Sequence, residues 1–137
     1  MTKEIYTTKL QSEILKIISE WCESRLTFET CGFIGEKDNV YTAMLCQNKS
    51  SDPRNFFSID PLEYLFFIEE YNPVALFHSH IDGDENPSEQ DIMMSENSCL
   101  PFFIYSLNTK NFHFYTTKKA KLDVSIIEKF KLAQWQR

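Results

Sequence analysis

The sequence of 137 residues predicts a single domain of the α/β (α+β) class, with helices flanking a central, mixed and twisted β-sheet. Two observations support this prediction. Segments with apolar residues at helical spacing alternate along the chain with short extended apolar runs. The composition, with 42% hydrophobic and 25% charged residues, is typical of a chain that folds around one core. One domain over residues 1–137 is therefore expected.

The expected elements follow one another as helix, hairpin, helix, strand, helix, strand pair and helix. Their ranges in chain order are 8–24, 31–37 with 40–47, 60–71, 73–80, 88–98, 101–107 with 111–117, and about 124–136. In the first helix, apolar residues from Leu10 to Trp21 recur at intervals of three and four, which gives the helix one apolar face. The hairpin is indicated by two short runs that Lys37-Asp38-Asn39 joins.

Capping and helix-breaking residues delimit the middle elements. Asp60 is a typical helix cap, and Pro61 fits the first helical position, where its missing N–H does no harm. Asn72-Pro73 ends that helix. The apolar run that follows predicts a buried strand ending in His78 and His80, and the polar residues 81–87 predict a loop before the next helix.

The last strand pair and the last helix each allow two interpretations. Six aromatic residues in the strands resemble a base-stacking surface, but the acidic composition favours a role in the core. These residues are Phe102, Phe103, Tyr105, Phe112, Phe114 and Tyr115. The apolar stripe of the helix at about 124–136 predicts either packing on the domain or self-association, so the sequence leaves the oligomeric state open.

Charge and cysteine content exclude several classes of protein. The net charge is −6, with 14 Lys and Arg against 20 Asp and Glu, which argues against binding to nucleic acid. The four cysteines are scattered and no secretory signal is apparent, so we expect a reduced, cytoplasmic setting. The apolar runs are far shorter than the roughly 18 residues of a transmembrane span, so no membrane association is expected.

Residues with metal or acid–base chemistry gather around the end of the predicted strand. Side chains two residues apart on a strand point to the same face, so His78 and His80 can bind one ion together. Asp91, in the first turn of the next helix, can supply a third ligand. Two histidines and one carboxylate leave one position of a tetrahedral zinc ion open, which is the pattern of a catalytic zinc site.

Each part of this pattern has an ordinary structural explanation. A His-x-His pair at a strand end usually binds no metal, and Ser88 and Asp91 have the spacing of a helix capping box. The full pattern His-x-His-x7-Ser-x2-Asp is expected by chance in only about 3 of 10,000 chains of this composition. Metallo-β-lactamase and amidohydrolase sites need more than three histidines, and an EF-hand loop needs a glycine where Pro87 stands.

The pattern resembles the JAMM motif of the MPN-plus (JAB) zinc metallopeptidases. The segment Phe28-Glu29-Thr30-Cys31-Gly32 is similar to the E-x-C-G segment of that family. Other segments resemble the prokaryotic branch that includes the JAB domain of phage tail assembly proteins, at residues 56–64, 75–80, 87–91 and 100–106. The resemblance covers most of the chain and implies the cytidine-deaminase-like JAB/MPN fold.

The resemblance also implies a role for each residue of the site. His78, His80 and Asp91 would bind Zn²⁺, Glu29 would act as general acid/base on the activated water, and Ser88 would donate a hydrogen bond to the developing oxyanion. The implied activity is hydrolysis of an amide or isopeptide bond in a protein or peptide substrate, including ubiquitin-like and phage tail polypeptides. The alternative is a metal-stabilised interaction or assembly module of the phage tail type, without turnover.

Overall fold

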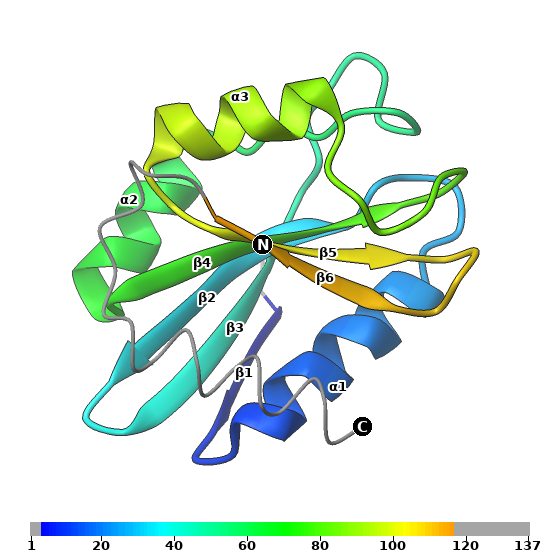
Figure 1. The fold of residues 1–137 in the computed structure, drawn as a ribbon. Helices are drawn as coiled ribbons and strands as arrows, with labels where there is room; N and C mark the ends of the chain where they lie inside the picture. The colour runs from blue at the N-terminus through cyan, green and yellow to red at the C-terminus, as the bar shows by residue number, and fades with distance from the viewer. Residues whose placement is uncertain (1–3, 117–137) are drawn as a thin grey trace.

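The computed structural model describes residues 4–116, and these form a six-stranded sheet between two layers of helices (Figure 1). The elements in chain order are β1 (Glu4–Thr8), α1 (Gln11–Glu23), β2 (Cys31–Lys37), β3 (Val40–Cys46), α2 (Pro61–Glu70), β4 (Pro73–His80), α3 (Glu89–Ser98), β5 (Phe102–Ser106) and β6 (Phe112–Tyr115). The strand order is β1-β3-β2-β4-β5-β6, with β4 and β5 parallel and the other neighbours antiparallel. The predicted class, a mixed sheet flanked by helices, is confirmed.

The N-terminal region differs from the sequence prediction. The first helix was expected from residue 8, but Thr8 ends the unpredicted strand β1 and α1 begins at Gln11. Strand β1 lies at the edge of the sheet and pairs only with β3, so it lacks the apolar alternation of a half-buried strand. The helix expected at about 124–136 lies outside the described residues.

Two hydrophobic cores lie on opposite faces of the sheet. The α1-side core joins the buried face of α1 to Phe77, Phe103 and other residues of the sheet. The α2–α3-side core contains Phe67 of α2, together with Phe33, Leu76 and Phe102 of the sheet. Side chains alternate along β4, so Phe77 enters the α1-side core while Leu76 and His78 point to the α2–α3 side.

The absence of a side chain at Gly32 lets β2 and β4 approach closely. A Cβ atom at this position would overlap the ring of Phe77 and the carbonyl oxygen of Met44. Beside Gly32, Cys31 pairs directly with His78 in the β2–β4 register. The close approach therefore fixes the position of the last residues of β4. Within residues 4–116, no helix has the length and apolar character that crossing a membrane requires.

Candidate metal centre

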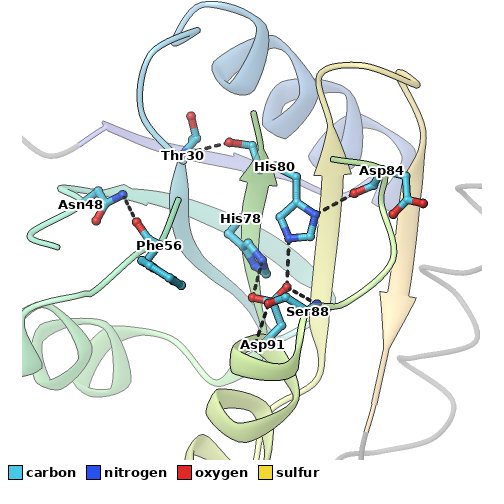
Figure 2. Close-up of polar contacts among 9 residues, drawn as sticks. Thr30, Asn48, Phe56, His78, His80, Asp84, Ser88 and Asp91 are labelled. Atoms are coloured by element: carbon cyan, nitrogen blue, oxygen red, sulfur yellow. Dashed lines mark hydrogen bonds and ion pairs between the residues drawn. The ribbon is translucent and has the colours of Figure 1, made fainter. Parts of the chain in front are cut away.

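Two histidines from the end of β4 and one aspartate from the start of α3 converge, as Figure 2 shows. The ligand atoms of His78, His80 and Asp91 all lie within 4.8 Å of one another. His78 and Asp91 are buried, and His80 is partly exposed. The three residues that the sequence pattern selects therefore form one group that could hold a metal ion.

A capping box orients the carboxylate of Asp91. The Asp91 backbone N–H donates to Oγ of Ser88 over 3.1 Å, and Oδ2 of Asp91 accepts from the Ser88 backbone N–H over 2.9 Å. The same Oδ2 atom lies 2.9 Å from Nε2 of His80, and Oδ1 lies 3.0 Å from Nε2 of His78. The helix cap and the ligand role of these residues are therefore compatible, because the cap turns the carboxylate toward both histidines.

The hydrogen bonds of His80 indicate which ring nitrogen can bind a metal. Its Nδ1 atom lies 2.7 Å from the carbonyl oxygen of Asp84, which can only accept, so Nδ1 carries a proton. Nε2 faces the carboxylate of Asp91. If the ring is charged, Nε2 donates a second N–H, and if the ring is neutral, Nε2 presents a lone pair. A lone pair and a carboxylate oxygen at this distance repel each other unless a cation lies between them. This arrangement fits a metal site.

His78 is fully buried and has an unpaired ring nitrogen. Its ring stacks on Phe57, with ring centroids 4.5 Å apart. Nε2 contacts Oδ1 of Asp91, whereas Nδ1 has no hydrogen-bond partner. Burial lowers the pKa of His78, so the ring is neutral and Nε2 or Nδ1 offers a lone pair. A buried ring nitrogen without a hydrogen bond costs free energy, and Nε2, which faces the Asp91 carboxylate, is the nitrogen that could bind a metal.

The protonation states of the other two ligands also fit a metal ion. Burial by itself raises the pKa of Asp91, but hydrogen bonds with His78 and His80 outweigh it and hold that pKa well below its ordinary value. For His80, burial favours the neutral ring, while the hydrogen bonds with Asp91 and the Asp84 carbonyl raise the pKa overall. A neutral imidazole, an ionised carboxylate and a second imidazole oriented by a carbonyl are a donor set that suits zinc.

Glu29, the predicted acid/base, is buried next to this group. Its side chain is 6% exposed although it lies in the loop before β2. Burial raises its pKa to about 9, and the negative charges of Asp91 and Asp52 add to the effect. Thr30, the next residue, is bound to the strand between the two histidines, because its N–H donates to Oγ of Ser79 over 2.8 Å. The backbone at Glu29 is therefore fixed relative to β4.

Asn48 holds the loop around Glu29, although no sequence pattern indicated this role. Its Nδ2 atom donates to the carbonyl oxygens of Glu29, Pro53 and Phe56 over 3.0, 3.2 and 3.0 Å. Figure 2 shows the bond to Phe56. Its Oδ1 atom accepts from the N–H of Ser58 over 3.1 Å and from a second loop N–H. The only sequence signal is an asparagine at the start of a polar loop, where this residue type often bonds backbone groups.

Two loops beside the site are joined by an ion pair. Arg54 belongs to the polar loop after β3, and Asp82 belongs to the loop after β4. The guanidinium group of Arg54 donates twice to the Asp82 carboxylate, over 3.1 and 3.0 Å. Both side chains are exposed, so the pair adds little stability, but its two-point geometry sets how the loops lie relative to each other.

Comparisons with known proteins place this geometry in context. A family model described as prokaryotic homologues of the JAB domain matches residues 11–119. Tail tip assembly protein K of Escherichia phage N15 is 33% identical over 78 residues, which are 57% of this chain and 32% of that protein. The match thus spans about a third of that relative's length. The solution structure of a protein from Desulfitobacterium hafniense shares the fold, with a TM-score of 0.59 and 24% identity over 70% of this chain and 72% of that one.

Proposed function

Because the chain belongs to the prokaryotic JAB-domain family, we propose that it is a zinc-dependent metallopeptidase that hydrolyses an amide or isopeptide bond in a protein or peptide. The observation that carries the proposal is the His78–His80–Asp91 group, which offers three ligands beside the buried carboxyl group of Glu29. Three protein ligands leave a position for water or substrate, and a purely structural zinc site usually has four.

Zn²⁺, when bound, supplies a Lewis acid that lowers the pKa of water and polarises the scissile carbonyl. Glu29 takes a proton from the attacking water on its carboxylate and returns it to the leaving amine. In the metal-free protein the raised pKa keeps this carboxyl protonated at neutral pH. A dication beside it favours the ionised form, so Glu29 becomes a base only when the site is loaded.

Ser88 can act on the developing oxyanion while it caps α3. Its Oγ atom accepts the N–H of Asp91, and this leaves the hydroxyl proton free to donate. The hydroxyl group lies at the N-terminus of α3, where the helix dipole favours negative charge. A donor aimed at the tetrahedral oxygen is worth roughly 3 kcal/mol of transition-state stabilisation in comparable oxyanion holes.

The substrate is proposed to be a flexible polypeptide segment that binds between the loops joined by Arg54 and Asp82. Ubiquitin-like tails and phage tail polypeptides both have this chemistry. The similarity to a tail tip assembly protein favours phage tail polypeptides. The same similarity supports a second candidate function, an assembly module in which the metal only stabilises the fold.

Two substitutions separate the candidates. We expect Glu29→Ala to retain zinc and to lower peptide cleavage about 10²- to 10⁴-fold, because it removes only the proton transfer. His78→Ala should lose zinc under either function. Glu20→Ala on the exposed face of α1 is the matched control and should leave both zinc and cleavage unchanged.

The substrate panel would include extended peptides, ubiquitin-like fusions and phage tail polypeptides. If the zinc-loaded protein cleaves none of them, or if Glu29→Ala cleaves as well as the wild type, the peptidase proposal is wrong. The assembly module would then be favoured.

A further inference from the structure

An apolar groove lies between α2 and α3 on the side of the sheet that carries the candidate metal centre. It has a volume of about 400 Å³. Phe33, Leu76 and Leu100 line it from the α2–α3-side core, and Tyr64 and Met94 line it from the two helices. A groove lined by so many apolar side chains is favourable for packing a helix.

The outer surface of α2, away from the buried Phe67, also carries exposed apolar side chains. Among the apolar side chains of α2 only Phe67 is buried, whereas Leu62 is 70% exposed and Leu65 is 50% exposed. Residues three apart lie on the same side of a helix, so these two leucines form one stripe. Apolar stripes of this kind on a soluble domain usually mark a surface that another element covers.

The chain leaves the described fold on this side of the sheet. Tyr115, near the end of β6, packs against the α2–α3-side core together with Tyr71 and Met94. It also pairs with Phe102, two residues after Leu100 of the groove. Figure 1 shows the end of β6 on the side of the sheet where α2 and α3 lie. The described chain therefore ends beside the α2–α3-side core.

Charge complements the apolar match. Besides Asp91 of the metal centre, helices α2 and α3 contain five acidic residues and no Lys or Arg. Residues 117–137 contain six Lys and Arg against two acidic residues, a net charge of +4 in a chain whose total is −6. On a helix over 124–136, Ile126, Ile127 and Phe130 share one face, and Lys129 and Lys131 border it on either side.

We propose that residues 124–136 form a helix that packs its apolar face into the groove between α2 and α3 of the same chain, with its flanking lysines facing the acidic residues of these helices. The lengths agree, because 13 helical residues span about 20 Å and the ten residues of α2 span about 15 Å. The seven residues 117–123 can extend to about 23 Å, enough to reach along the groove. The proposal is independent of metal binding and of peptidase activity.

Amide hydrogen exchange on the full chain, read out by mass spectrometry, tests the proposal. In the wild type, residues 124–136 should exchange at least about tenfold more slowly than the same segment as a free peptide. Tyr64→Glu should abolish this protection, because Tyr64 lines the groove and the change places a charge in the apolar contact. Leu10→Glu is the matched control: Leu10 is 54% exposed and precedes α1, so the protection should persist.

A substitution in the segment 124–136 itself makes the test independent of changes in α2. Ile127→Glu should abolish the protection of 124–136 and also speed exchange in α2. Free-peptide exchange rates in the wild type, or protection that survives Tyr64→Glu, would overturn the proposal. Protection that rises with protein concentration, together with a dimeric mass in solution, would overturn it in favour of a second copy of the chain.

Discussion

On the α1 side of the sheet, Phe77 packs among apolar side chains, with Trp21 of α1 stacked 6.0 Å from its ring. On the opposite side, the next residue of the same strand is His78, which is equally buried but has one ring nitrogen, Nδ1, without a hydrogen-bond partner. On the α1 side, a polar group such as the Tyr105 hydroxyl has a partner, because it donates to Glu23 over 2.8 Å.

This difference separates stability from function within one strand. Burying an unpaired ring nitrogen costs free energy, and the packing of the sheet does not require a histidine at this position. Proteins depart from complete hydrogen bonding mainly at functional sites. Both sides of the sheet carry a hydrophobic core, but only the α2–α3 side combines it with a group that could hold a metal ion.

The largest expected effect is on zinc affinity, and it appears when one buried residue on each side of the sheet is substituted. We expect His78→Ala to weaken zinc binding by more than the roughly 100-fold that loss of an outer-shell partner costs. Phe77→Leu should instead lower the free energy of unfolding by about 1–2 kcal/mol and leave zinc affinity unchanged. Zinc titration and chemical denaturation of both variants check this. Equal zinc affinity in the two variants would remove the distinction between the faces.

A pH-dependent effect should follow from Glu29 in the metal-free protein. Its pKa is raised to about 9 in the folded state, so the folded protein keeps this proton where the unfolded chain loses it. The contribution of Glu29 to stability is therefore complete below about pH 4.5, falls by at most about 1.4 kcal/mol per pH unit above it, and is lost above about pH 9.

The variant Glu29→Gln cannot ionise at this position, so it lacks this loss of stability. Without metal, its free energy of unfolding minus that of the wild type should therefore be larger at pH 8 than at pH 5. Denaturation curves with a chelator at both pH values measure this difference, which isolates Glu29 from the other titrating groups. Identical pH dependence in the two proteins would show that the carboxyl group is not desolvated in the folded state.

A loss of stability without loss of zinc is expected from Asn48→Ala, which leaves three carbonyl oxygens without their shared donor. We expect about 2–3 kcal/mol lower stability, together with reduced cleavage at unchanged zinc content, because the loop no longer fixes Glu29. Asn55→Ala in the same loop removes only exposed contacts with Asp52 and should change stability by less than about 0.5 kcal/mol. A similar loss in both variants would refute the special role of Asn48.

The smallest effect is expected from removing the N-terminal caps of α2 and α3, which lie on the same face of the sheet. Ser88→Ala and Asp60→Ala each remove a side-chain cap, so each should lower stability by about 1 kcal/mol. Only Ser88→Ala should also lower cleavage, because only Ser88 lies beside the metal group. Thermal denaturation and peptide cleavage assays measure the two effects separately. An equal loss of cleavage in Asp60→Ala would assign the Ser88 effect to helix stability alone.

The sequence was sufficient to predict the elements with strong local signals. Asp60 and Ser88 cap their helices as expected, and His78, His80 and Asp91 converge because a strand end and a helix start have short, regular geometry. Strand β1 was not predicted, because it depends on pairing with β3, more than 30 residues away in the chain. The hydrogen bonds of Asn48 and the stacking of Phe57 on His78 depend on loop conformation, which periodicity does not encode.

The zinc content of the wild-type protein, measured by elemental analysis after purification without chelators, tests the central claim most directly. The proposed centre predicts about one zinc per chain, and none in His78→Ala purified in the same way. A wild-type protein that contains far less than one zinc per chain and binds none when zinc is added would contradict the assignment of the α2–α3 side as a metal centre.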